Sequence, residues 1–247
     1  RRVRRQVCRR IARRIAELGL DSVEGYRRYL RDHPLEWRYL DRLCRVTISS
    51  FYRDREVFAR FTSEVMPALL HQVQPEKEML RIWSVGCASG EEPYTIAILW
   101  HHLLRPDFPE ISLEILATER DPQMIDRART ARYPLSSLRK LPGWLLEKAF
   151  APAAGEVYAL KPVYRQYVCF EQEDIRVIAP EGRFHAVFCR NLVFTYFALQ
   201  LQEQILSTLC RSMVRGGALV VGSHESLPPG AAGFEQWAGN LPIFRKR

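Results

Sequence analysis

Residues 80–100 (LRIWSVGCASGEEPYTIAILW) constrain the fold most, because three elements follow one another there in a fixed order. Residues 79–85 form a short apolar run, typical of a strand that is covered on both faces. Gly86 and Gly90 bound a loop whose backbone is free to approach a ligand, and a helix beginning near Glu91 presents unpaired N–H groups to it. Two ordinary turn glycines are the simpler alternative. The order as a whole favours a nucleotide-type cofactor site at the carboxyl end of a parallel strand.

The 247 residues are enough for one large α/β domain and a small helical one. We predict a helical N-terminal domain with its connector at residues 1–72, where apolar residues recur at helical spacing. Within it, Gly19 ends one predicted helix and the Asp21-Ser22 pair caps the next. We predict a Rossmann-like domain at residues 73–247, because strand-like and helix-like runs alternate there.

The larger domain departs from strict alternation at one place. Residues 155–170 read as two strands around Lys161-Pro162 with no helix between them, so we expect a small antiparallel β-hairpin insertion at about 152–170. The Gly216-Gly217 pair is predicted to end the last helix, and residues 242–244 to add an antiparallel strand at the sheet edge. The predicted strands of the sheet are 79–85, 113–117, 167–170, 184–189 and 218–223, and its helices extend to about 104 and over 122–131 and 199–213.

The formal net charge is +9, and eight arginines fall within the first 14 residues. Such a cluster attracts polyanions, so nucleic acid, an acidic protein surface and a membrane headgroup layer are candidate partners, and a solvated helix face is the simpler alternative. No apolar run is long enough for a transmembrane segment or a signal peptide, so we expect a soluble, cytoplasmic protein. The six scattered cysteines lack CxxC pairs, which predicts reduced thiols and no metal site.

Polar residues follow each predicted strand, at the edge where ligands of open parallel sheets bind. Glu119 follows the second strand and is placed to hold both ribose hydroxyls of an adenosine. Asp174 follows the strand after the insertion and is suited to accept a hydrogen bond from an adenine amino group. The Arg190-Asn191 and Ser223-His224-Glu225 groups follow later strands. The GxxxxGK[ST] pattern is missing, which argues against a nucleoside triphosphatase.

Five segments of the chain resemble those of the CheR-type S-adenosylmethionine-dependent methyltransferases, which methylate glutamate side chains of bacterial chemoreceptors. The resemblance covers nearly the whole chain, and the motifs follow one another at sensible spacing. It implies a helical N-terminal domain and a Rossmann-like domain with a small β-subdomain, in agreement with the pattern described above. The matching segments are TISSFYRD (47–54), IWSVGCASGEEPYT (82–95), ILATERD (115–121), FHAVFCRN (184–191) and GGALVVGSHESL (216–227).

The resemblance implies S-adenosylmethionine as cofactor, with S-adenosylhomocysteine as product. Arg53 and Tyr196 are implied to orient the reacting groups, Glu119 to hold the ribose, and Asp174 with Ile175 to flank the adenine. Arg190 and Asn191 are implied to lie beside the amino-acid end and the transferred methyl group. The implied cofactor-binding residues are Thr47, Ser49, Arg53, Gly86, Glu91, Glu119, Asp174, Ile175, Arg190 and Asn191.

The chain departs from the family pattern at four places. The family usually has Asp where Glu119 stands, Asn where Asp174 stands and Thr where Ser49 stands, and each replacement keeps the type of hydrogen bond. The segment NLVFTYF at residues 191–197 is one residue longer than its family counterpart. That extra residue can move Tyr196 by about an ångström and so change which methyl acceptor fits.

The methyl acceptor therefore has several interpretations. The leading one is a glutamate carboxylate of a chemoreceptor-like protein with acidic methylation sites; it is already ionised at neutral pH and needs no general base. A small molecule or a nucleic acid is the first alternative, and an amine, thiol or hydroxyl acceptor makes His224 the first base to consider. The second alternative is that the protein is a regulatory module, which binds the cofactor but transfers no methyl group. In the leading interpretation, the basic N-terminal helix contacts an acidic surface.

Overall fold

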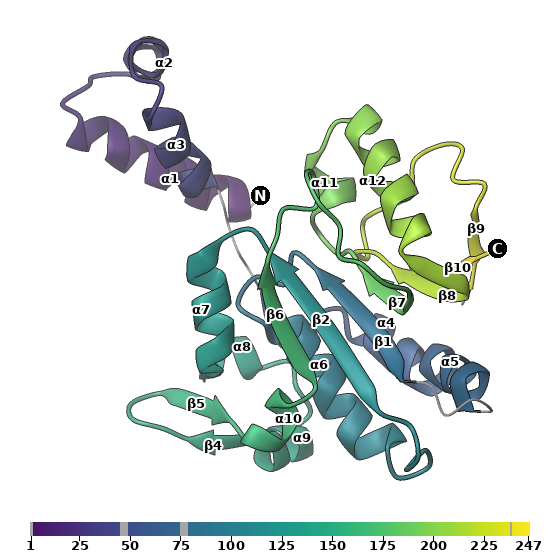
Figure 1. Cartoon of the computed structure of the whole chain (residues 1–247). Helices are drawn as coiled ribbons and strands as arrows, with labels where there is room; N and C mark the ends of the chain where they lie inside the picture. The colour runs from purple at the N-terminus through teal and green to yellow at the C-terminus, as the bar shows by residue number, and fades with distance from the viewer. Residues whose placement is uncertain (1, 45–48, 75–78, 238) are drawn as a thin grey trace. The chain divides into compact units, whose positions relative to one another are not determined.

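The computed structural model describes residues 2–44, 49–74, 79–237 and 239–247, in two compact units that divide between residues 48 and 49 (Figure 1). Residues 49–72, which the sequence placed with the helical domain, belong to the larger unit. Their apolar side chains explain the difference, because Phe51, Phe58 and Leu69 are fully buried in the core of the sheet domain. Among the described residues, no helix is long and apolar enough to cross a membrane.

The N-terminal unit consists of helices α1 (Arg2–Glu17), α2 (Val23–Asp32) and α3 (Glu36–Cys44). The predicted cap is confirmed, because the Ser22 hydroxyl accepts a hydrogen bond from Gly25 N at 3.0 Å. A buried carboxylate joins the three helices: Arg14 Nε and Nη2 each donate to Glu36 at 2.9 Å, and the Tyr26 hydroxyl donates at 2.9 Å. The Arg14 hydrogen bonds hold the pKa of Glu36 below its usual range.

The larger unit is built on a seven-stranded sheet with the order β6-β2-β1-β7-β8-β10-β9. The pairs formed by β1, β2, β6, β7 and β8 are parallel, whereas β10 is antiparallel to both β8 and β9. The order reverses at β1, whose neighbours are β2 and β7, and this is the position at which such sheets bind nucleotides. The strands are β1 (Leu80–Val85), β2 (Leu113–Glu119), β6 (Val168–Gln172), β7 (Phe184–Phe188), β8 (Met213–Val220), β9 (Phe234–Gln236) and β10 (Ile243–Lys246).

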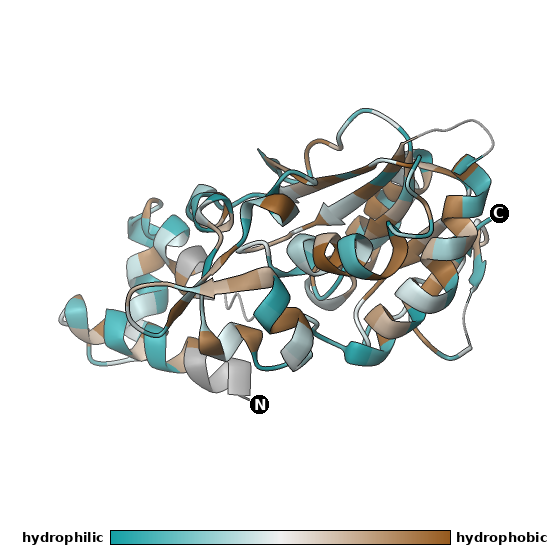
Figure 2. Cartoon of the chain, turned by 90° about the horizontal axis from the view of Figure 1, so that it is seen from below, coloured by the Kyte–Doolittle hydropathy of each residue, from teal (hydrophilic) through white to brown (hydrophobic). Residues whose placement is uncertain are grey.

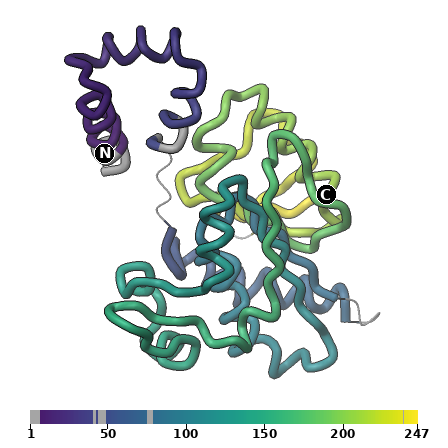
Figure 3. Tube along the Cα trace, turned by 60° about the vertical axis from the view of Figure 1, so that its left-hand side comes forward, coloured from purple at the N-terminus to yellow at the C-terminus, as the bar shows by residue number. Residues whose placement is uncertain are grey.

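Apolar clusters cover both faces of the sheet, and Figure 2 shows brown, hydrophobic residues both in the strands and in the helices of this unit. One face packs against α4 (Arg55–Arg60), η1 (Phe61–Val65), α5 (Met66–Val73), α6 (Glu91–Leu99), η3 (Trp100–Leu104) and α7 (Pro122–Thr130). The other packs against α11 (Val193–Tyr196) and α12 (Leu199–Arg211). On that second face, residues 173–183 cross from β6 to β7 without a helix, as the trace in Figure 3 shows.

The small antiparallel sheet has the order β3-β5-β4 and differs from the predicted hairpin. Its strands are β3 (Arg132–Pro134), β4 (Phe150–Pro152) and β5 (Val157–Leu160), joined by α8 (Leu135–Leu138) and α9 (Gly143–Ala149). The expected pairing across Lys161-Pro162 is wrong, because β5 pairs with β3 and β4, whereas β6 joins the large sheet. A one-turn helix, α10 (Pro162–Arg165), connects β5 to β6, and Pro162 lies in its first turn, where proline is favourable.

Two further expectations need correction. The Gly216-Gly217 pair does not end α12, which stops at Arg211; both glycines lie inside β8, where Gly216 has φ +77 and the register with β7 shifts. Glycines in a strand often mark such an irregularity. The last strand is antiparallel as predicted, but it is not the edge strand. A short strand that the sequence did not indicate, β9, covers it.

Candidate functional site

The loop after β1 is shaped by two glycines that no other residue replaces without strain. Gly86 has φ +67, and an added Cβ would lie 2.5 Å from Leu192 Cδ2. Gly90 has φ +87 and forms the N-terminal cap of α6, where an added Cβ would lie 3.0 Å from Ala128 Cβ. Both glycines therefore fix the path of the loop, as the sequence suggested.

Glu119 ties the end of β2 to this loop. Its Oε2 accepts from Ala88 N at 3.1 Å and its Oε1 from Asp121 N at 3.0 Å. A carboxylate has about four lone-pair sites, so these two bonds leave capacity for two further donors. Two neighbouring hydroxyls, such as those of a ribose, fit that remaining capacity.

Glu91 is the buried carboxylate of the loop, with 3% of the residue exposed. Ser89 Oγ donates to its two oxygens at 3.0 and 2.9 Å, and the Ser49 hydroxyl bonds to it as well. Desolvation raises the pKa of Glu91 despite these bonds. The contact with Ser49 brings a predicted residue of the connector to the loop.

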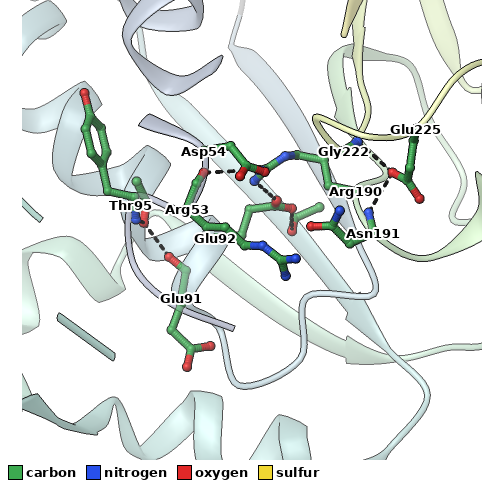
Figure 4. A network of polar contacts seen from close by, with 11 residues as sticks. Arg53, Asp54, Glu91, Glu92, Thr95, Arg190, Asn191, Gly222 and Glu225 are labelled. Carbon is green, nitrogen blue, oxygen red and sulfur yellow. Dashed lines mark hydrogen bonds and ion pairs between the residues drawn. The ribbon is translucent and has the colours of Figure 1, made fainter. Parts of the chain in front are cut away.

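Arg190 anchors the connector to the end of β7, as Figure 4 shows. Its Nη2 donates to Asp54 Oδ2 at 2.6 Å and to the carbonyl oxygen of Arg53 at 3.1 Å, and its Nη1 donates to Glu92 Oε2 at 2.8 Å. The Arg190 side chain is only 3% exposed. It is thus a buried cation between two carboxylates, and it holds the backbone that carries Arg53.

Sequence reasoning missed this network. Glu92 and Asp54 were given no role at the site, although Asp54 lies within the segment TISSFYRD. Arg190 was expected beside the amino-acid end of the cofactor. In the structure, Nη1 and Nη2 of Arg190 donate hydrogen bonds to other residues of the protein. Its Nε is buried and has no hydrogen-bond partner among the residues that the structure describes. The sequence did place a cation, Arg190, after the strand β7 and a carboxylate, Glu92, at the start of α6, but nothing in it showed that the two are paired.

Four of the five non-glycine residues with positive φ among the described residues surround this edge of the sheet. They are Tyr52 (φ 54), Asp54 (φ 60), Ala88 (φ 51) and Asn191 (φ 54). Such a conformation costs roughly 1–2 kcal/mol for each residue, so the surrounding contacts must impose it. One such contact is Tyr52 N, which donates to Thr95 Oγ1 at 3.1 Å, while Thr95 Oγ1 donates to Glu91 O at 2.6 Å. Strain of this kind collects at functional sites.

Asn191 and α11 form the side of the site after β7. Glu225 Oε2 accepts from Asn191 N at 2.7 Å and from Gly222 N at 2.6 Å, and Glu225 Oε1 accepts from the Thr195 hydroxyl at 2.5 Å. Tyr196 follows at the end of α11 with 64% of the residue exposed. The predicted residues Asn191 and Tyr196 therefore share one short segment.

Asp174, after β6, is already engaged. Arg176 donates to both of its oxygens at distances from 2.5 to 3.1 Å, and Arg120 lies 4.0 Å away. The Arg176 hydrogen bonds lower the pKa of Asp174. Ile175 packs against the cluster on the α12 face. The adenine role of this pair stays a prediction, as do the roles of the other predicted residues, and Thr47 lies outside the described residues.

The arrangement fits a cationic ligand with hydrogen-bonding groups. Among the described residues, three buried side-chain polar atoms have no partner, and two of them, Glu173 Oε2 and Arg190 Nε, lie after β6 and β7 on either side of the glycine loop. Carboxylates of Glu91, Glu92 and Glu119 gather at the same edge, in a protein whose formal net charge is +9. Glu92 is paired with Arg190, whereas Glu91 and Glu119 have no cationic side chain from the described part of the chain bonded to them and would attract a positive charge. S-adenosylmethionine, with its sulfonium, ammonium and ribose hydroxyls, matches these groups.

The chain matches two family models. Residues 47–240 match the S-adenosylmethionine-binding domain of CheR methyltransferase, and residues 3–41 match the all-alpha domain of CheR methyltransferase.

Three similar proteins illustrate the relatives. A chemotaxis protein methyltransferase of Listeria monocytogenes is 30% identical over 185 residues, which cover 75% of this chain and 67% of that protein. Chemotaxis protein methyltransferase 2 of Pseudomonas aeruginosa is 30% identical over 226 residues, 89% of this chain and 78% of that protein. A 104.1 kDa protein of Rhodobacter capsulatus is 31% identical over 221 residues, 90% of this chain but only 23% of that longer protein.

Proposed function

This chain belongs to the CheR methyltransferase family of S-adenosylmethionine-dependent enzymes, and we propose that it methylates glutamate side-chain carboxylates of a chemoreceptor-like protein. Relatives that carry the name chemotaxis protein methyltransferase support this acceptor. The observation that carries the proposal is the convergence of Glu119, the glycine loop and the anchored Arg53 backbone at one edge of the sheet.

The residues at this edge of the sheet have different roles in the proposed reaction. Glu119 and Glu91 hold the cofactor from the loop side, and Asn191 and Arg53 lie toward the acceptor side. When bound, S-adenosylmethionine supplies an electrophilic methyl group. A glutamate acceptor is ionised at neutral pH, with a reference pKa of about 4.3, so no residue of the chain needs to remove a proton. Arg53 and Tyr196 orient the acceptor carboxylate and exclude water, effects that contribute several kcal/mol in near-attack geometries.

The protein partner is proposed to meet the basic face of α1 as well. Arg9 and Arg13 are exposed on this helix, and the Arg13 side chain is 73% exposed even though it lies 3.7 Å from Glu17. Exposed arginines attract an acidic surface, and salt screens the attraction over about 10 Å at 0.1 M. We expect binding of an acidic receptor fragment to weaken as salt is raised and in an Arg9→Ala/Arg13→Ala variant.

A reaction in the cytoplasm is proposed too, since the described cysteines are free thiols.

Two measurements test the function separately. Calorimetry of the purified chain with S-adenosylmethionine and S-adenosylhomocysteine tests the pocket. Replacing Glu119 by Ala is expected to weaken binding about tenfold, the effect of one or two lost buried hydrogen bonds.

Incubation of a chemoreceptor cytoplasmic fragment with methyl-labelled cofactor tests the acceptor. We expect label that alkali releases as methanol, because carboxyl methyl esters hydrolyse in base whereas methylated amines do not. A fragment with its methylatable glutamates replaced by Ala is the control. Label that resists alkali, or label on the control fragment, would contradict a glutamate acceptor.

A further inference from the structure

Glu225 connects three segments of the candidate site through one buried carboxylate. The residue is 9% exposed, and its oxygens accept from the backbone N–H groups of Asn191 and Gly222 (Figure 4). They also accept from the Thr195 hydroxyl. The N–H groups belong to the chain that follows β7 and β8, and the hydroxyl belongs to α11. The sequence places Glu225 at the ligand-binding edge of the sheet and within the segment 216–227, but neither this position nor the proposed reaction gives Glu225 a specific task.

The segment that Glu225 contacts, α11, is too short to keep its conformation without contacts from the rest of the protein. Helix α11 has four residues, far fewer than a helix needs to be stable alone. It follows Asn191 at φ +54, a conformation that asparagine adopts more readily than most residues but still at a cost. Val193 is buried and anchors one side of the helix, whereas Thr195 and Tyr196 are exposed. The bond from Thr195 to Glu225 therefore fixes the other side.

The local packing is shaped around this carboxylate. At Gly222, an added Cβ would lie 2.6 Å from Glu225 Oε2 and 2.3 Å from Asn191 Nδ2. Glycine is thus the residue that lets the carboxylate and the Asn191 amide approach the backbone after β8.

We propose that Glu225 is a positioning residue for methyl transfer: it fixes the turn at Asn191 and helix α11, and through them the place of Tyr196. The proposal rests on the methyltransferase function given above. Both Glu225 oxygens are directed at the chain's own donors, so Glu225 acts through Asn191 and Thr195 rather than on the reacting atoms.

Three variants separate its contacts. Glu225→Gln keeps them all, because the amide oxygen accepts from the two N–H groups and the amide nitrogen donates to Thr195 Oγ1. Glu225→Ala removes all three, and Thr195→Val removes only the bond to α11. Glu203→Ala, which removes an exposed carboxylate of α12, is the control.

Each variant is measured for hydrogen exchange of residues 191–197 with S-adenosylhomocysteine bound, for affinity for that product, and for methyl transfer to the receptor fragment. For Glu225→Ala we expect exchange at least tenfold faster and kcat about 100-fold lower, the effect of a misplacement near 1 Å. The KM for S-adenosylmethionine is expected to change less than about threefold. Thr195→Val is expected to be intermediate, and Glu225→Gln and Glu203→Ala to stay within about threefold of the wild type.

The outcomes separate the two proposals. Unchanged exchange in Glu225→Ala overturns the positioning role, whether or not the wild type methylates the fragment. Faster exchange with unchanged kcat also overturns it, as does a Glu225→Gln variant as impaired as the alanine variant. A wild type that binds the product but methylates no glutamate rejects the proposed acceptor alone, and the exchange of residues 191–197 then decides the role of Glu225.

Discussion

The two sides of the candidate site are held in different ways. On the side of β2, the glycine loop is fixed by backbone geometry and by hydrogen bonds to Glu119 and to buried Glu91. On the side of β7, the connector and α11 are fixed by buried ionised groups, Arg190 with Asp54 and Glu92, and Glu225 with its three donors. The first side suits a rigid binding site for a cofactor, whereas the second holds in place the short segments that we propose to face the acceptor.

This difference predicts which property each substitution damages. Removing the hydrogen bonds of a buried charged group on the second side should mainly reduce folding stability and displace the segments that we propose to face the acceptor. Changing the loop geometry should mainly reduce cofactor binding. Three substitutions, taken from the largest expected effect to the smallest, can break or sharpen that contrast.

Replacing Arg190 by Met should have the largest effect on stability. It leaves Asp54 and Glu92 without their cation in a partly buried place, and breaking a buried ion pair on one side costs about 3–5 kcal/mol. Chemical denaturation measures the free energy of unfolding. The triple variant Arg190→Met/Asp54→Asn/Glu92→Gln is the control and should recover most of the loss, because no uncompensated charge remains. A loss below about 1 kcal/mol in the single variant would mean that water, and not Arg190, satisfies the two carboxylates.

Replacing Gly86 by Ala should reduce stability by about 2 kcal/mol and also abolish cofactor binding. The added Cβ meets Leu192 at 2.5 Å and is strained by φ +67. Gly155→Ala is a matched control, because Gly155 has φ +72 but no atom within 4 Å of an added Cβ. The free energy of unfolding of this control variant should fall by about 1 kcal/mol, and its affinity for S-adenosylhomocysteine should not change. Equal losses in both variants would show that the backbone conformation alone, without the contact with Leu192, limits the loop.

The same contrast explains what the sequence could and could not predict. The glycine loop, Glu91 and Glu119 could be singled out as candidates because they follow the ends of two strands, where ligands of such sheets bind. The Asp54–Arg190 pair joins residues 136 apart, and Glu225 meets Asn191 across 34 residues. No spacing rule relates such residues.

The fold was predictable to a similar degree. The periodicity of residues 79–131 located two strands and two helices. The small sheet was misassigned because strands of three or four residues carry little periodic signal, and Pro162, which follows β5 and precedes β6, reads equally as part of a turn or as the first residue of a helix. Residues 49–72 were grouped with the N-terminal helices because helical spacing shows which face is apolar, and not which core buries it.

The smallest expected effect has opposite signs for stability and binding, and it comes from Glu91→Gln. Desolvation raises the folded-state pKa of Glu91, so the ionised carboxylate opposes folding above its unfolded-state pKa, and this cost disappears as pH falls through the raised value. At pH 7 the glutamine variant should therefore be more stable, by about 1 kcal/mol or less. It should also bind S-adenosylmethionine more weakly, because a negative charge facing the cationic cofactor is lost.

The product provides the control for this prediction. S-adenosylhomocysteine lacks the sulfonium charge, so its affinity should change less than that of S-adenosylmethionine when Glu91 is replaced. In the wild type, the preference for S-adenosylmethionine over the product should fall as pH is lowered toward the raised pKa of Glu91, and in the variant it should not depend on pH in that range. Calorimetry from pH 5 to pH 8 measures both affinities. Parallel changes for the two ligands would place the Glu91 charge away from the sulfonium and leave it a structural carboxylate of the loop.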